Sequence, residues 1–121
     1  VLDTGNPMLM GVIPGGAKLI KIDLKKNKIL LKYFFNRPVI SENSYLNDIR
    51  VDEKNKKAYI TDSGEGGIIV LDTDSGIQRK VLKNHYSTMA EPGYIIKVNG
   101  KACLNSDGKP FEVQSDGLAL D

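Results

Sequence analysis

Residues 47–82 read NDIRVDEKNKKAYITDSGEGGIIVLDTDSGIQRKVL, and this stretch decides the fold class. It contains four short apolar or alternating segments, which are Asn47–Asp52, Lys57–Thr61, Gly67–Asp72 and Gln78–Leu82. Turns rich in Asn, Asp, Ser, Gly and Lys separate these segments, as is typical of strands joined by tight connections. Four strands within about 40 residues are the size of one β-propeller blade. The stretch therefore predicts a four-stranded antiparallel blade.

Two further strands are predicted upstream of this unit. Residues Lys18–Leu24 alternate between apolar and polar side chains, which is the two-residue period of a half-buried strand. A lysine-rich turn follows, and Ile29–Phe35 is a second strand rich in aliphatic and aromatic residues. A helix is the competing interpretation of this region. It fails because the apolar residues form a block rather than a stripe with a spacing of about 3.6 residues.

The pattern of the central unit recurs at both ends of the chain. Three pairs of segments are similar, and they are Val1–Gly5 with Ile60–Gly64, Lys18–Asp23 with Gly67–Asp72, and Asp116–Asp121 with Asn47–Asp52. Each pair alone is a weak match, because short apolar strings recur by chance. Every segment nevertheless falls at its correct place in the four-strand cycle, so the order of the matches supports a repeat architecture.

The repeat predicts an all-β fold, a fragment of a propeller made of four-stranded antiparallel blades. We expect residues 1–36 to form the last three strands of one blade, residues 47–83 a full blade, and residues 116–121 the first strand of the next. The last repeat offset is longer than the roughly 40 to 45 residues of a blade. Residues 84–115 are therefore predicted to form a loop with an inserted hairpin. Both termini read as the middle of strands, so we expect the chain to be part of a longer protein.

The composition excludes several classes of protein. The chain has 121 residues, of which 40% are hydrophobic and 26% charged, a balance typical of globular domains. A net charge of +2 is too small to indicate a nucleic-acid or anionic-membrane partner. No apolar run approaches the roughly 20 residues of a membrane span. The single cysteine, Cys103, excludes an internal disulfide and a CxxC metal site.

The run Leu46–Val70, with its segments LNDIRVD, AYITDS and GIIV, resembles the Yellow/major royal jelly protein family. The opening Val1–Gly5 and the closing Asp116–Leu120 are similar to the family pattern in the same order. The resemblance implies a six-bladed propeller, related in fold to the gluconolactonase/regucalcin hydrolases, and a secreted or periplasmic location. Lysine-rich turns and the absence of any Asn-x-Ser/Thr sequon indicate a bacterial relative.

Asn47 and Asp116 occupy equivalent places at the start of strands that would line the central channel. An amide oxygen and a carboxylate that converge there suit Ca²⁺ or another divalent cation, because Ca²⁺ takes six to eight oxygen ligands from several segments. In the gluconolactonase/regucalcin relatives an Asn and an Asp in similar motifs hold a divalent metal, with help from a Glu of the first blade. The resemblance thus implies Asn47 and Asp116 as metal ligands. The alternative is that both side chains cap turns through the backbone.

Other candidate residues lie near these two or in the predicted loop. Asp48 is a candidate acid/base group beside the metal, and its alternative role is a hydrogen bond to loop backbone. His85, Tyr86 and Tyr94 are candidates for ligand contact, with ordinary loop positions as the alternative. The segment Asp62–Gly64 ends a strand and is interpreted as turn chemistry.

Three functions remain open. The first is a Yellow-type propeller that binds a small molecule, such as an aromatic amine, at the central channel. The second is a lactone or ester hydrolase in which a divalent metal polarises the carbonyl and a carboxylate moves the proton. The third is a non-catalytic interaction scaffold, because a fold alone does not fix a function. The expected partners are a small-molecule ligand or substrate and the remaining blades of the same propeller, and neither nucleic acid nor a membrane.

Overall fold

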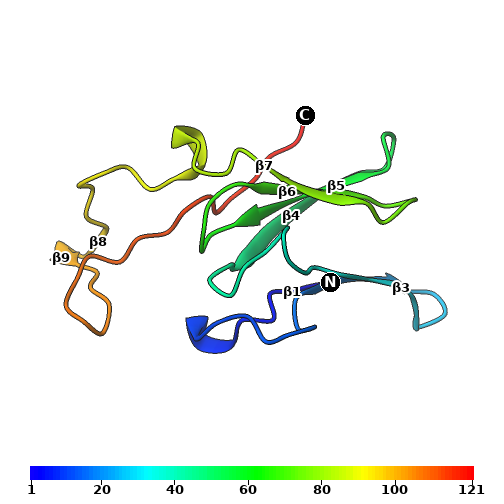
Figure 1. The fold of residues 1–121 in the computed structure, drawn as a ribbon, viewed down its shortest axis with the longest axis horizontal. Helices are drawn as coiled ribbons and strands as arrows, with labels where there is room; N and C mark the ends of the chain where they lie inside the picture. Colours follow the sequence, from blue (N-terminus) through cyan, green and yellow to red (C-terminus); the bar gives the residue numbers. More distant parts are fainter.

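The computed structural model describes all residues from Val1 to Asp121 and contains two antiparallel sheets, a long excursion and a C-terminal segment (Figure 1). The strands are β1 (Leu2–Asp3), β2 (Lys18–Asp23), β3 (Lys28–Phe34), β4 (Leu46–Asp52), β5 (Lys57–Asp62), β6 (Ile68–Asp72), β7 (Gln78–Val81), β8 (Lys97–Val98) and β9 (Lys101–Ala102). The 3₁₀ helices are η1 (Pro7–Leu9) and η2 (Tyr86–Thr88). Neither helix has the length and apolar character needed to cross a membrane.

The first sheet has the strand order β1-β2-β3, and all its pairs are antiparallel. Leu19 of β2 lies opposite Leu2 on one side and Tyr33 on the other. The connection from β2 to β3 is a tight turn, in which the Asp23 carboxylate accepts the N–H groups of the two lysines that follow it. Asn27 takes a φ of 50°, a left-handed conformation that Asn tolerates well.

The second sheet has the order β4-β5-β6-β7, again antiparallel throughout. The β6–β7 turn is closed by Asp72, whose Oδ1 accepts the N–H groups of Asp74 and Ser75, and by Gly76 at a φ of 75°. These are local turn signals of the kind that the sequence displays. The predicted all-β fold, built from antiparallel blade-like sheets, is confirmed.

The core lies between the two sheets, which sit one over the other in Figure 1. Its nine buried apolar residues are Ala17, Leu19, Phe35, Ile40, Leu46, Ala58, Ile60, Ile69 and Leu71. Most of those from the strands occupy alternate positions, because side chains of a strand point to opposite faces in turn. A hydrogen bond of 2.6 Å from the Tyr33 hydroxyl to the carbonyl of Thr73 also ties the first sheet to the β6–β7 turn.

Residues 84–115 leave the second sheet and return to it, and they carry the small hairpin of β8 and β9 at their far end (Figure 1). An isolated antiparallel bridge between Leu104 and Pro110 closes a second turn within this excursion. The two ends of the excursion meet beside the sheet, where the N–H of Ser115 donates to the carbonyl of Thr88 at 3.0 Å.

Residues 116–121 form no strand in the structure, although the sequence predicts one there. The segment instead crosses beside β4, where the N–H of Leu118 donates to Asp48 Oδ2 at 2.9 Å. A strand exists only where a neighbouring strand pairs with it, and residues 116–121 have no such partner in this chain. Their assignment to a further blade stays a prediction.

Candidate functional site

Asn47 and Asp116 lie in contact, although 69 residues separate them along the chain. Asn47 is near the start of β4 and Asp116 begins the C-terminal segment, and both are exposed. The amide nitrogen of Asn47 donates a hydrogen bond to Oδ1 of Asp116. The structure therefore brings together the two side chains that the repeat pattern places at equivalent positions.

Ser63, directly after β5, joins Asn47 to the C-terminal segment. Its Oγ accepts a hydrogen bond from Asn47 Nδ2 at 3.1 Å and donates one to the carbonyl of Ser115 at 2.8 Å. A hydroxyl can play both parts at once because it has one proton and two lone pairs. Ser63 thus connects β4 with the incoming chain through a single oxygen atom.

Thr61, two residues earlier on β5, repeats this arrangement. Its Oγ1 accepts from the N–H of Asp48 at 3.0 Å and donates to the carbonyl of Asp116 at 2.6 Å. We call Thr61 and Ser63 the hydroxyl bridges. Because residues two apart on a strand point to the same face, both bridges clamp the C-terminal segment against the same side of β4 and β5.

Asp48 is fully engaged as an acceptor. Its Oδ2 accepts the N–H of Leu118, and its Oδ1 accepts the N–H of Ile49 and lies 2.6 Å from Nη1 of Arg50. The Leu118 N–H, followed by the Ile49 N–H and Arg50, lowers the pKa of Asp48 below its usual 3.8. These contacts match the role of a backbone acceptor, and a lowered pKa does not suit a proton donor near neutral pH.

The residues of this chain do not by themselves fit Ca²⁺. Asn47 Oδ1 and the second carboxylate oxygen of Asp116 are two oxygen ligands, whereas Ca²⁺ takes six to eight. No group of three or more His, Cys, Asp or Glu side chains in residues 1–121 lies close enough together to hold a metal ion. We therefore derive no hydrolytic step from this pair.

His85, Tyr86 and Tyr94 lie on the excursion. His85 caps η2, where its Nδ1 lies 2.8 Å from the hydroxyl of Ser87, and its ring is tilted against that of Tyr86 at 4.4 Å between centroids. Tyr86 is 85% exposed and Tyr94 67% exposed. No hydrogen bond joins any of the three to the Asn47–Asp116 pair, so a ligand contact at these residues stays a prediction.

A cleft of about 840 Å³ opens between the loop of residues 6–14, the connection that enters β4, and the returning end of the excursion. We call it the loop-face cleft, and its lining residues are Asn6, Leu9, Met10, Gly11, Val12, Ile13, Pro14, Glu42, Asn43, Tyr45, Ser63, Gly64, Phe111, Glu112 and Val113. Ser63 belongs both to this cleft and to the hydroxyl bridges. The charged side chains of the lining are both acidic, namely Glu42 and Glu112.

A second hollow, of about 560 Å³, lies between the two sheets. Nine of its 14 lining residues are hydrophobic, and its charged residues carry both signs, with Lys21 and Lys56 beside Glu53 and Asp74. Such a lining selects no ligand charge. Neither Asn47 nor Asp116 lines this hollow. We interpret it as incomplete packing between the two sheets.

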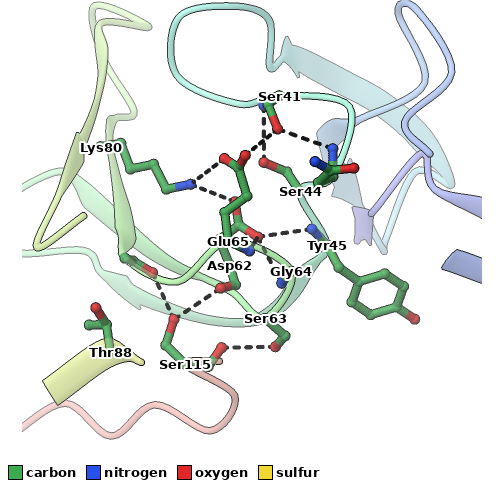
Figure 2. Close-up of polar contacts among 12 residues, drawn as sticks. Ser41, Ser44, Tyr45, Asp62, Ser63, Gly64, Glu65, Lys80, Thr88 and Ser115 are labelled. Carbon is green, nitrogen blue, oxygen red and sulfur yellow. Dashed lines mark hydrogen bonds and ion pairs between the residues drawn. The ribbon is translucent and has the colours of Figure 1, made fainter. Parts of the chain in front are cut away.

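A buried ion-pair cluster that the sequence did not predict lies at the end of β5 (Figure 2). Asp62, the last residue of β5, is completely buried, and its Oδ2 lies 2.8 Å from Nζ of Lys80, whose side chain is 6% exposed. Glu65 is the second partner of Lys80 at 3.3 Å and accepts a hydrogen bond of 2.5 Å from the Ser41 hydroxyl. The cluster links β5 and β7 to the connection that enters β4.

Burial by itself raises the pKa of Asp62, because an apolar environment disfavours the charged form. Hydrogen bonds from Lys80, Ser44 and the N–H of Tyr45 outweigh this effect and hold the pKa below 3.8. One sequence signal could have revealed the cluster. Lys80 lies opposite the fully buried Ile69, and a lysine in a core-facing row requires a carboxylate partner.

A family model described as "Major royal jelly protein" matches residues 1–114 of the chain. No curated protein matches the chain significantly. The matched range contains both sheets, the loop-face cleft and all but the last residue of the excursion, and it ends before the C-terminal segment that carries Asp116.

Proposed function

The chain belongs to the major royal jelly protein family, and on this premise we propose that it is part of a propeller that binds a small molecule at the entrance of its central channel. The ligand that suits the site is a small cation with an apolar body, such as an aromatic amine. One observation carries the proposal. Seven of the 15 residues that line the loop-face cleft are hydrophobic, and its only charged lining residues are the two carboxylates Glu42 and Glu112.

The size and walls of the cleft support a small-molecule ligand. Its volume of about 840 Å³ falls within the range of roughly 300 to 1,000 Å³ that is usual for ligand pockets. Leu9, Met10 and Phe111 supply apolar surface, and Met10 is 87% exposed. Large apolar side chains that remain exposed around a concavity often mark a binding site.

The backbone at the rim of the cleft supports the same conclusion. Met8 and Leu9 take φ values of 55° and 60°, in the left-handed region that non-glycine residues seldom adopt. Such strain costs about 1 to 3 kcal/mol per residue and concentrates at ligand-binding segments. The strained turn presents Leu9 and Met10 to the cleft, where a ligand would cover them.

The charge of the cleft selects the kind of ligand. Arg37 lies 3.8 Å from Glu42 and offsets its charge, whereas Glu112 has no ion-pair partner, so Glu112 is the main source of negative charge in the lining. Beside the cleft, the exposed Asp116 adds a further carboxylate. A ligand ammonium group would find acceptors here, whereas a carboxylate or phosphate would be repelled.

The test is calorimetric titration of the full chain with three probes that share one aromatic body: phenethylamine, 2-phenylethanol and 3-phenylpropanoate. We expect saturable binding of the amine and at least tenfold weaker binding of the alcohol and the acid. Glu112→Gln should weaken amine binding about fivefold, as expected for the loss of about 1 kcal/mol. Glu91→Gln, on the exposed part of the excursion, is the matched control and should bind like the wild type. Equal binding of amine and alcohol would contradict the proposal.

A metal-dependent lactone or ester hydrolase is the second candidate, and the contact between Asn47 and Asp116 favours it. Further ligands would have to come from other segments of the propeller. Titration of the full chain with Ca²⁺ tests this candidate, together with Asn47→Ala. Unchanged Ca²⁺ affinity in that variant would remove Asn47 from any metal site. Binding of neither amine nor Ca²⁺ would leave the interaction scaffold.

The remaining blades of the same propeller are the proposed partner of the outer sheet faces. Ile29, Leu30 and Leu31 of β3 are each about half exposed, and Phe34 is 46% exposed. A strand with this much exposed apolar surface is uncommon at the surface of an isolated sheet and suits an interface between neighbouring blades.

A further inference from the structure

We infer that Ser63 is a positioning residue that fixes the direction of the Asn47 amide, so that the Asn47–Asp116 pair offers acceptor oxygens only. This inference rests on the proposed function, because Ser63 lines the loop-face cleft and joins it to the Asn47–Asp116 pair, where a ligand ammonium group would find further acceptors. It starts from the one proton of the Ser63 hydroxyl. That proton is donated to the carbonyl of Ser115 at 2.8 Å.

Neighbouring residues hold the Ser115 carbonyl where it can accept the hydrogen bond from the Ser63 hydroxyl. The N–H of Ser115 donates to the carbonyl of Thr88 at 3.0 Å, and its hydroxyl donates to the carbonyl of Gly67 at 2.8 Å. The N–H of Gln114 donates to the carbonyl of Ser63 itself at 3.0 Å. Residues 114 and 115 are therefore anchored on three sides, and the position of the carbonyl does not depend on Asn47.

With its proton committed, the Ser63 oxygen can only accept a hydrogen bond from Asn47. The amide must therefore turn its nitrogen, not its oxygen, toward Ser63, and the observed separation is 3.1 Å. The second proton of the same nitrogen is donated to Asp116 Oδ1. A flipped amide would place its oxygen against both a committed hydroxyl and a carboxylate, and both contacts would be repulsive.

The Asn47–Asp116 pair therefore offers a ligand hydrogen-bond acceptors and no donors. Both protons of Asn47 Nδ2 are donated, one to Ser63 and one to Asp116, so its Oδ1 and the second oxygen of Asp116 are left for a ligand. Oxygen acceptors without a neighbouring donor suit an ammonium group and disfavour a carboxylate or a carbonyl. Selection at the Asn47–Asp116 pair therefore depends on Ser63 together with Asp116, and Ser63 need not touch the ligand.

The experiment compares Ser63→Ala, which removes the hydroxyl, with Ser63→Thr, which keeps it. Ser106→Ala, in the exposed turn of the excursion, is the control for loss of a serine hydroxyl elsewhere. The first readout needs no ligand and is the pair of side-chain NH₂ resonances of Asn47 in the full chain, identified by their loss in Asn47→Ala. We expect slow exchange of both protons in the wild type, Ser63→Thr and Ser106→Ala. One proton should exchange fast in Ser63→Ala.

The second readout is the affinity for phenethylamine relative to 2-phenylethanol. Ser63→Ala should lose about five- to tenfold of this preference, the effect of about one hydrogen bond, and Ser63→Thr should retain it. If the wild type binds no amine but shows the amide signature, the proposed function fails and the role of Ser63 stands. If Ser63→Ala keeps both the signature and the preference, the role of Ser63 is overturned while amine binding stands.

Discussion

Two short turns of the molecule, Asp3–Gly5 and Asp62–Gly64, have nearly the same sequence but different surroundings. Each turn begins at the last residue of a strand, which is Asp3 in β1 and Asp62 in β5. In each turn the aspartate Oδ1 accepts the N–H of the glycine at 3.0 Å. The first carboxylate is about half exposed and pairs with Lys18 at 2.6 Å. The second is completely buried and pairs with Lys80. The local sequence thus determines the conformation of the turn, whereas the surrounding residues determine how much its aspartate contributes to stability.

The glycines show that the two turns obey the same steric rule. A Cβ on Gly5 would lie 2.2 Å from the backbone nitrogen of Ala17, and one on Gly64 would lie 2.0 Å from the carbonyl oxygen of Asn43. Real Cβ atoms do not approach backbone this closely, so only glycine fits at either place. The turns are tight because another stretch of backbone passes against each of them.

The residue in the middle of each turn shows the difference most clearly. Ser63 joins β4 to the C-terminal segment, whereas Thr4 Oγ1 is buried and has no hydrogen-bond partner. A buried hydroxyl without a partner destabilises the fold by roughly 1 to 3 kcal/mol. A hydroxyl at this position therefore stabilises the protein only where another segment of the chain forms hydrogen bonds with it.

The largest expected effect separates the two aspartates. Asp62→Asn leaves the buried Lys80 with only Glu65 as a charge partner, and we expect a loss of about 3 kcal/mol in the free energy of unfolding. Urea denaturation of the full chain, followed by circular dichroism, measures it. A loss below about 1 kcal/mol would show that the buried cluster is not a major source of stability.

The same aspartate makes stability depend on pH. The pKa of Asp62 is lowered on folding, so its contribution is fully present above its ordinary value of 3.8 and is lost as the pH falls through the lower folded value. We expect the wild type to lose stability steeply below about pH 4. Asp62→Asn should show a shallower slope there, and equal slopes in an acid titration would count against the assignment.

A smaller effect is expected at the exposed turn. Asp3→Asn removes a pair in which the two side chains are 45% and 23% exposed, so the loss should be about 0.5 to 1 kcal/mol. The loss should shrink further at about 1 M salt, because salt screens exposed charges. Urea denaturation at low and high salt measures both values. A loss as large as that of Asp62→Asn would remove the contrast between the turns.

The only gain in stability is expected at the middle position. Thr4→Val replaces a hydroxyl that has no partner by a methyl group of similar size, so the free energy of unfolding should rise by about 1 kcal/mol. Thr61→Val is the matched variant and should cost about 1 to 3 kcal/mol, since it removes both hydrogen bonds of a hydroxyl bridge. Equal thermal midpoints for the two variants would contradict this ranking.

Most of the fold could be predicted because its signals are local. The alternation in Lys18–Leu24 and the Asp-Thr-Asp-Ser-Gly turn after β6 specify strands and turns without reference to distant residues. The excursion was harder, because its β8–β9 hairpin has only two residues per strand. Residues 116–121 carry a strand pattern, but pairing depends on a neighbour that this chain does not provide.

Part of the candidate site could be predicted as well. The repeat placed Asn47 and Asp116 at matching positions, and register then brings such residues to one place. The roles of Thr61 and Ser63 could not be predicted, since the sequence Thr-Asp-Ser-Gly is typical of an ordinary turn. Its function as a bridge depends on the path of a segment more than 50 residues away.

The pinned ends of the excursion have a consequence for how this protein can vary. Two hydrogen bonds hold the two ends of residues 91–113 together. They run from the N–H of Ser115 to the carbonyl of Thr88 and from the N–H of Ala90 to the Gln114 side chain. Lengthening a closed loop costs little, about 0.6 kcal/mol for each doubling. A longer or shorter version of this stretch should therefore be tolerated without displacing Asp116 from Asn47.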